Sequence, residues 1–277
     1  MKSIYESMEQ SFVLAYKALQ KGFEVKLLMR HSLRESGPGI MPKFEDGPTR
    51  EGKILAKHCG RSLEGISLGR IVTSASHRCM QTGEYIAQGY GRDIIIQQND
   101  ILSYLWICDR EKWRTTFESY NQNIRTILET LLDRQSYNKE ILGGVYPLQT
   151  TLELLLKTMW HNPKDTIFTQ LPRIDLWIAQ PLPHHTSYDI ESCFSNYSHT
   201  REGQDIQGVL DIFVTHDSFI MLFLCALLDK KLADMEWIYM LEGVFVWFDT
   251  KDKILHCAWR GIEYSVGLEY KYENSIL

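Results

Sequence analysis

The sequence lacks several features that would mark particular classes of protein. The first 20 residues contain no uninterrupted apolar run, because Glu6, Glu9 and Lys17 are interleaved with aromatic side chains, so they predict neither a signal peptide nor a membrane anchor. The formal net charge of −5 argues against a general nucleic-acid binder, which needs a basic surface to displace counterions. We therefore expect no membrane partner and no nucleic-acid partner, and a cytoplasmic location.

A C-x-x-C pair is also missing. The six cysteines are scattered along the chain, and free thiols in a reducing compartment are the simplest interpretation of them. His184-His185 with Cys193 and His199 is the group that most suggests a metal, but its spacing matches no zinc pattern. We predict no metal and no other cofactor.

The chain is long enough for one large domain. Its 277 residues are 44% hydrophobic and show no internal repeat, which predicts a single domain over residues 1–277 with a substantial insertion. Helical and strand patterns alternate over most of it. Helices are expected at 3–21, 49–59, 78–88 and 218–228, and strands at 25–29, 70–74, 94–97, 209–215, 244–248 and 254–259.

This alternation predicts an α/β fold with three layers, in which a mostly parallel sheet has helices on both faces. From about residue 109 to residue 207 the pattern changes to long helical segments, at 113–132, 148–160 and 166–178. We interpret this stretch as a helical insertion that forms a cap over the sheet.

Three expected strands end in unusual polar groups. Arg30, His31 and Arg34 follow the first strand, Arg78 opens the helix after the second, and His216-Asp217 ends the strand at 209–215. The carboxyl ends of parallel strands open onto one edge of the sheet, where ligands bind in open α/β folds. Guanidinium groups match phosphate oxygens and stay charged at physiological pH. The pattern therefore predicts a pocket for a small anion.

Four blocks of sequence, in this order, resemble the histidine phosphatase superfamily, also called the phosphoglycerate mutase-like or histidine acid phosphatase fold. The blocks are Arg30-His31-Ser32-Leu33-Arg34, Pro48-Thr49-Arg50-Glu51-Gly52, Ser74-Ala75-Ser76-His77-Arg78-Cys79-Met80-Gln81-Thr82-Gly83-Glu84 and Thr215-His216-Asp217. The resemblance covers residues 24–89 and 209–228 and hardly touches the middle of the chain. Ser32 stands where the family has glycine, so it could narrow the pocket or lend a hydroxyl group.

The resemblance implies a metal-independent phosphomonoesterase acting on a small phosphorylated substrate. His31 would attack phosphorus and form a phosphohistidine, while Arg30, Arg34 and Arg78 neutralise the phosphoryl oxygens. His216 would donate a further hydrogen bond.

The acid that protonates the leaving group is a separate question. Asp217 is our choice, because His-Asp is the pattern of the acid phosphatase branch. In the mutase-like branch the acid lies after the second arginine, which leaves Asp100, Asp109 and Glu111 as alternatives.

Two other functions use the same residues. A mutase-like phosphotransferase would share the pocket, and a phosphate-binding or scaffolding protein would bind phosphate without turnover. The aromatic cluster at Trp237-Ile238-Tyr239 is interpreted as core, with an edge that could serve a dimer. The identity of the substrate and the oligomeric state stay open.

Overall fold

The computed structural model describes residues 4–35, 43–104, 107–120, 124–132, 144, 148–160 and 206–267. None of the helices in these ranges combines the length and the apolar character that a membrane crossing requires.

A seven-stranded mixed sheet forms the centre of the molecule, in the order β3-β2-β4-β1-β5-β6-β7. Four neighbouring strands are parallel: β3 (Ile95–Gln98), β2 (Leu68–Thr73), β4 (Val209–Thr215) and β1 (Glu24–Arg30). The strands β5 (Gly243–Asp249), β6 (Ile254–Trp259) and β7 (Ile262–Gly267) continue the sheet in antiparallel pairs. Arg30 pairs with Thr215 and Thr73 pairs with Val214, so β1, β4 and β2 end level at one edge.

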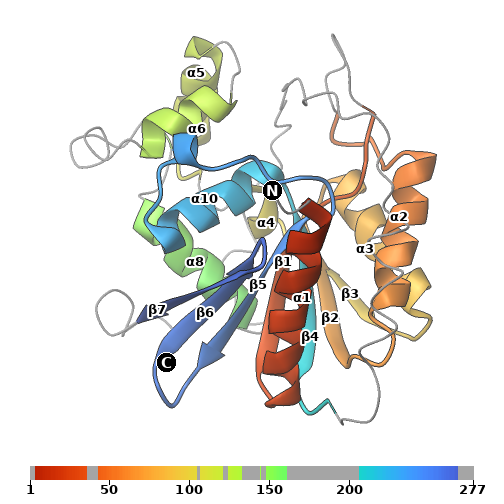
Figure 1. Ribbon diagram of the computed structural model, residues 1–277. Coiled ribbons are helices and arrows are strands. Elements are labelled where there is room, and N and C mark those ends of the chain that lie inside the picture. The colour runs from red at the N-terminus through yellow and green to blue at the C-terminus, as the bar shows by residue number, and fades with distance from the viewer. Residues whose placement is uncertain are drawn as a thin grey trace.

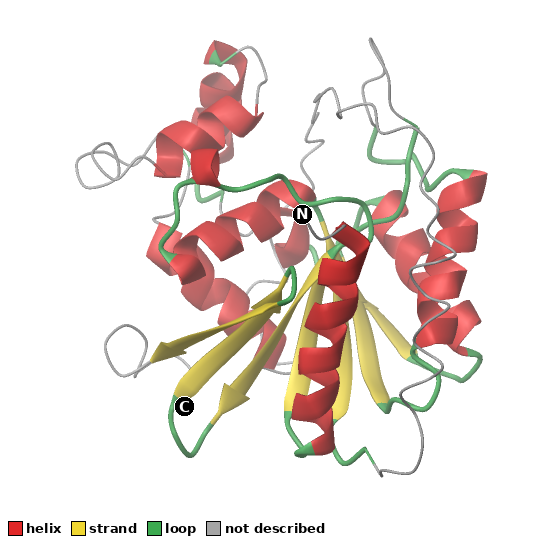
Figure 2. Ribbon diagram, viewed as in Figure 1, coloured by secondary structure: helices red, strands yellow, loops and turns green. Residues whose placement is uncertain are grey.

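Helices cover both faces of this sheet (Figures 1 and 2). On one face lie α1 (Ile4–Gln20), α2 (Arg50–Ser62) and α3 (His77–Tyr90), and on the other lie α6 (Ile124–Leu132), α8 (Leu148–Trp160) and α10 (Asp217–Leu228). Successive residues of a strand point to opposite faces. Leu27 and Met29 accordingly pack in one hydrophobic cluster and Leu28 in the other. The three-layer α/β/α architecture expected from the sequence is confirmed.

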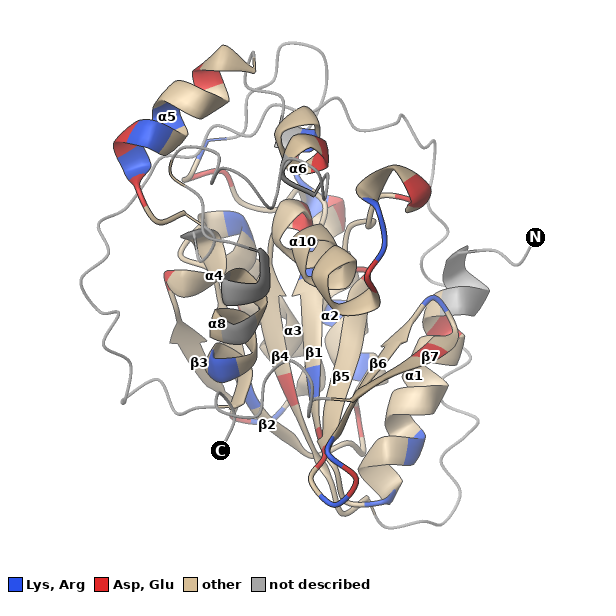
Figure 3. Ribbon diagram, turned by 90° about the vertical axis from the view of Figure 1, so that its left-hand side faces the viewer, with Lys and Arg blue, Asp and Glu red and all other residues tan. Residues whose placement is uncertain are grey.

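The helices differ in how much of their surface is exposed to solvent. Nearly every residue of α10 is apolar and buried, because this helix is packed against α8, α6 and β1. By contrast, α5 (Arg110–Ser119) contains several Lys, Arg and Glu residues, whose positions are blue and red on the ribbon of Figure 3. The short helices α4 (Ile101–Tyr104) and η3 (Leu232–Asp234) complete the described elements.

The described part of segment 109–207 holds α5, α6 and α8, of which α8 has the expected bounds. The expectation of one continuous helix over 113–132 is wrong. The helix α5 ends at Ser119, and the backbone N–H of Tyr120 folds back onto the carbonyl groups of Glu118 and Thr116. The polar sequence Asn121-Gln122-Asn123 has no apolar side chain to continue a buried stripe. The helix expected at 166–178 lies outside the described residues.

Candidate active site

His31 is the first residue beyond β1. Its backbone N–H donates to the carbonyl oxygen of Thr215 at 3.0 Å, which fixes it at the edge of the sheet beside the end of β4. The side chain is buried, with 3% of its surface exposed. Its Nδ1 lies 2.8 Å from the carbonyl oxygen of Ser32. A carbonyl only accepts, so Nδ1 carries the proton and Nε2 keeps its lone pair.

The charge state of His31 follows from its surroundings. Burial lowers the pKa of the imidazole well below its usual value, and the positive charges of Arg78 and Arg30 and the ring of His216 lower it further. The hydrogen bond to Ser32 opposes this change and is outweighed. His31 is therefore neutral at physiological pH, which a nucleophile requires.

Arg78 enters the site from the first turn of α3. Its Nη1 donates to the carbonyl oxygen of Lys43 at 3.0 Å, and its Nη2 lies 3.5 Å from His216 Nδ1. The buried Nε of Arg78 has no hydrogen-bond partner among the described residues. Buried donors are normally paired, so this one is suited to a bound anion.

His216 lies between the end of β4 and the start of α10. Its ring is 5.6 Å from that of His31, centroid to centroid, at an interplanar angle of 69°. Its Nε2 is 3.1 Å from Ser74 Oγ, which in turn is 2.6 Å from Ser103 Oγ on α4. Burial lowers the pKa of His216 well below its usual value, and the charge of Arg78 adds to that effect. Both histidines are thus neutral and side by side.

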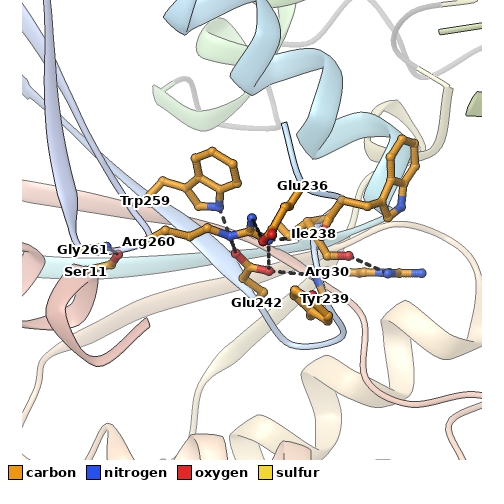
Figure 4. Close-up of polar contacts among 10 residues, drawn as sticks. Ser11, Arg30, Glu236, Ile238, Tyr239, Glu242, Trp259, Arg260 and Gly261 are labelled. Atoms are coloured by element: carbon orange, nitrogen blue, oxygen red, sulfur yellow. Dashed lines mark hydrogen bonds and ion pairs between the residues drawn. The ribbon is translucent and has the colours of Figure 1, made fainter. Parts of the chain in front are cut away.

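Arg30, the last residue of β1, has a buried side chain with two partners. Its Nη1 donates to the carbonyl oxygen of Ile238 at 2.7 Å (Figure 4), and its Nη2 lies 2.6 Å from Asp217 Oδ2. Its Nε has no partner within the described part of the chain. Arg30 therefore combines a fixed position with an unused donor.

Asp217, the first residue of α10, is a buried carboxylate with several donors around it. Its Oδ1 accepts the backbone N–H of Ser218 at 2.7 Å, and its Oδ2 accepts Trp237 Nε1 at 3.1 Å in addition to Arg30. Burial by itself raises the pKa of Asp217, but the charge of Arg30 and the two hydrogen bonds outweigh it and hold this pKa below its usual value.

Arg34 is half-buried, and its Nη1 donates to the carbonyl oxygen of Glu35 at 2.9 Å. Burial, followed by the charges of Arg78 and Arg30, lowers its pKa to about 10, against the opposing effect of Asp217 and Asp46. It stays charged at neutral pH. The structure thus brings Arg30, His31, Arg34, Arg78, His216 and Asp217 into one electrostatic neighbourhood at the sheet edge.

Ser32 does not offer its hydroxyl group to a ligand. Its Oγ donates to the carbonyl oxygen of Gly52 at 2.7 Å, and its backbone N–H donates to Thr82 Oγ1 at 3.0 Å. The loop after β1 is therefore tied to the beginning of α2 and to α3. A side chain on Gly52 would overlap the carbonyl oxygen of Leu33, which explains glycine at that position.

The three alternative acids have partners within their own segments. Asp109 caps α5 by accepting the backbone N–H of Lys112 at 3.1 Å, and Glu111 pairs with Arg114 at 2.6 Å. Asp100 accepts a hydrogen bond from Gln98 at 2.9 Å. These contacts span two or three residues of sequence, whereas the contacts of Asp217 join three separate parts of the chain.

Four residues of the site were not identified from the sequence as site residues. From a loop before β5, Trp237 contacts Asp217 and Ile238 contacts Arg30. Ser74 is hydrogen-bonded to His216 and also to Ser103. Ser74 stands within a family-like block, so its motif was a usable signal. Nothing in the sequence near Trp237 or Ser103 indicates a contact with the site.

No group of three or more His, Cys, Asp and Glu side chains that could hold a metal ion occurs in the described ranges. His184, His185, Cys193 and His199 lie outside those ranges.

No protein-family model matches the chain, and no curated protein is similar to it in sequence. Solved structures are similar in arrangement. YhfR of Bacillus stearothermophilus is 17% identical, with a TM-score of 0.48 over 86% of this chain and 96% of its own. A mycobacterial glucosyl-3-phosphoglycerate phosphatase is 11% identical, with a TM-score of 0.46 over 81% and 90%.

A phosphoserine phosphatase of Entamoeba histolytica is 13% identical, with a TM-score of 0.46 over 88% of this chain and 95% of its own. Two of these three structures are named as phosphatases. At these identities and TM-scores, the chemistry of this chain has to be argued from its own side chains.

Proposed function

We propose that this chain is a metal-independent phosphomonoesterase that works through a phosphohistidine at His31. The observation that carries the proposal is a buried, neutral imidazole whose Nδ1 is held by Ser32 and whose Nε2 therefore keeps its lone pair, close to the charges of Arg30 and Arg78. Its substrate is a small phosphorylated molecule.

In the first step, Nε2 of His31 attacks phosphorus. A phosphorus–nitrogen bond forms as the phosphorus–oxygen bond to the leaving group breaks, and Asp217 gives its proton to the departing oxygen. In the second step, Asp217 takes a proton from water while the water oxygen attacks phosphorus. Phosphate leaves, and His31 regains its lone pair.

The arginines supply most of the stabilisation in this scheme, since phosphoryl transfer depends on positioning and on neutralising the equatorial oxygens. The Nε groups of Arg30 and Arg78 have no partner among the residues that the structure describes, which supports the role of both side chains as phosphate ligands. Arg34 adds a third positive charge from the loop. In the free protein both ring nitrogens of His216 have partners, Nδ1 with Arg78 Nη2 at 3.5 Å and Nε2 with Ser74 Oγ at 3.1 Å. A hydrogen bond from His216 to the same oxygens therefore requires that phosphate displace one of these partners.

Asp217 is better supported as the acid than Asp100, Asp109 or Glu111, because it is buried against Arg30 and His216. Its ionised state in the free protein suits the second step but not the first. A bound phosphate dianion would compete for Arg30 and add negative charge nearby, and both effects raise the pKa of Asp217. Substrate binding itself would thus favour the protonated form that the first step needs.

A catalytically inactive phosphate-binding protein is the second candidate. The observation in its favour is the Arg30–Asp217 ion pair at 2.6 Å, which ties the proposed acid to a proposed phosphate ligand. Such a protein would bind phosphate or vanadate and turn nothing over.

Hydrolysis of p-nitrophenyl phosphate in the presence of EDTA tests the proposal. We expect activity that survives the chelator and falls about 1,000-fold or more in His31→Ala, since loss of a nucleophile removes the covalent route. His58→Ala, a histidine on α2, is the matched control and should keep its activity. A denaturing alkaline quench with labelled substrate should trap a phosphoenzyme in the wild type and none in His31→Ala.

Full turnover by His31→Ala would refute the phosphohistidine mechanism. Absence of turnover in the wild type, with vanadate still bound, would favour the binding protein.

A further inference from the structure

The loop between η3 and β5 contacts both members of the Arg30–Asp217 pair. Trp237 donates its indole N–H to Asp217 Oδ2 at 3.1 Å, and Ile238 accepts a hydrogen bond from Arg30 at 2.7 Å through its carbonyl oxygen. The positions of the proposed acid and of one proposed phosphate ligand therefore depend on how this loop is held.

Glu242 holds the loop from its end, as Figure 4 shows. Its side chain is completely buried, and both carboxylate oxygens are occupied. Its Oε1 accepts Trp259 Nε1 at 3.0 Å and Arg260 Nε at 2.8 Å, while its Oε2 accepts the backbone N–H of Tyr239 at 2.7 Å and Arg260 Nη2 at 3.2 Å. A buried carboxylate with this many donors is rigidly placed.

Arg260, which forms an ion pair with Glu242, also contacts the loop. Its Nη2 donates to the carbonyl oxygen of Trp237 at 3.1 Å, and its Nη1 lies 3.0 Å from Glu236. The residue stands in the two-residue turn between β6 and β7, with φ of 49°, followed by Gly261 with φ of 74°. Asn or Gly is usual at the first position of such a turn. The presence of arginine there indicates that the contacts of its side chain are needed.

We propose that Glu242 and Arg260 are positioning residues for the proposed reaction, which hold Trp237 and Ile238 against Asp217 and Arg30. An ion pair with one fully buried and one largely buried member contributes little net stability compared with apolar residues of the same shape, so a role in placing other groups accounts for it better. The inference rests on the proposed function, because it concerns the acid of that reaction.

The pair should therefore affect the pH dependence of the reaction. Asp217 is faced by Arg30, Arg34, Arg78 and His216 and by the indole of Trp237. If the indole moves away, the carboxylate loses a donor and holds its proton to higher pH. The descending limb of the pH–rate profile should then shift upward.

The test uses an alkyl phosphate, whose poor leaving group makes protonation by the acid matter. We expect Trp237→Phe to move the descending limb of kcat/KM up by about one pH unit. Arg260→Lys keeps the charge beside Glu242 but cannot reproduce the fork of bonds to Trp237, so it should cause a smaller shift in the same direction. The Trp237→Phe/Arg260→Lys double variant should move the descending limb no further than Trp237→Phe alone.

Arg70→Lys is the matched control. Arg70 also forms a partly buried ion pair, with Asp211 at 3.0 Å, and donates to the carbonyl oxygen of Met159 at 3.1 Å, but it lies three residues before the end of β2. The Arg70→Lys variant should be less stable than the wild type, and its pH–rate profile should be unchanged. If Arg260→Lys does not fold, Glu242→Gln replaces it, since it keeps the shape and weakens the same bonds.

An unchanged profile in a folded Arg260 or Glu242 variant would overturn the inference, as would shifts that simply add in the double variant. The result for His31→Ala is independent of these measurements. If that variant is inactive and Arg260→Lys has a normal profile, the proposed function stands and the positioning role fails.

Discussion

At the residue scale, the site lowers the pKa of two groups of opposite charge type. His31 is kept neutral by burial and by Arg78, while Asp217 is kept ionised chiefly by Arg30, against the effect of its burial. The neutral imidazole is ready to attack phosphorus over a wide range of pH. The ionised carboxylate is ready to accept a proton from water but has to gain one before it can act as an acid.

This difference predicts a dependence on the leaving group. Because the pKa of Asp217 in the free protein lies below its usual value, its protonated fraction falls as pH rises, so kcat/KM for an alkyl phosphate should be highest in acid and decline towards neutral pH. Asp217→Asn should slow an alkyl phosphate about 100-fold to 10,000-fold. It should slow p-nitrophenyl phosphate far less, because p-nitrophenolate leaves without a proton. Steady-state kinetics of both substrates over a pH series measure this.

Asp100→Asn serves as the control for that experiment, since Asp100 is an alternative acid that accepts a hydrogen bond from Gln98. It should change neither substrate's rate. An equal loss on both substrates in Asp217→Asn would instead mean that the carboxylate acts by holding Arg30 in place.

At the element scale, the position of Arg78 depends on how closely α3 packs against α2. The two helices approach until Gly60 of α2 faces the carbonyl oxygen of Ile86 and Gly89 of α3 faces that of Lys57. A side chain at either glycine would overlap those oxygen atoms. Neither glycine has a positive φ, so the need is for space between the helices.

Gly89→Ala should therefore destabilise the protein by about 2 kcal/mol, because backbone atoms have to move apart to admit the methyl group. Gln88→Ala, an exposed position on the same helix, should cost little or nothing. Urea unfolding followed by circular dichroism gives both values. A Gly89→Ala variant as stable as Gln88→Ala would show that α2 and α3 separate easily.

The elements also show why some of this structure could be predicted and some could not. The polar residues at the strand ends could be predicted from the sequence, because an apolar run and the polar residues that follow it are adjacent in sequence, as at Leu28 and Arg30. The contact of Trp237 with Asp217 spans 20 residues and depends on the path of a loop, which no periodicity encodes. The Glu242–Arg260 pair depends on a hairpin turn in the same way. The break after Ser119 was missed because apolar residues continue on both sides of it.

At the scale of the whole molecule, the site is a polar region enclosed between two hydrophobic cores. One core contains Leu27 and Met29 and the other Leu28, and Arg30 and His31 follow directly. His31 and His216 are both buried and neutral there. Folding therefore requires two imidazoles to give up the protons that they would bind in the unfolded chain at acidic pH.

The sign of the resulting pH dependence is definite. Both histidines have a pKa in the folded state that is well below about 6.5, the value for the unfolded chain. Between those values the unfolded chain binds more protons, so stability falls as pH drops below about 6.5. Each histidine adds a slope of at most about 1.4 kcal/mol per pH unit within that window. Asp217, whose pKa is also lowered, adds a further loss at lower pH.

We expect the free energy of unfolding, measured with urea, to decrease from pH 7 to pH 5.5, and to decrease less in a His31→Asn/His216→Asn variant, which lacks these two buried imidazoles. An equal slope in the double variant would show that other groups cause the acid sensitivity. Vanadate should restore part of the stability at pH 5.5, because an anion held by Arg30 and Arg78 beside the two rings favours their protonated forms and binds the folded state alone. The low-pH conditions that protonate Asp217 are thus those in which the free protein is least stable, and a bound anion offsets that loss.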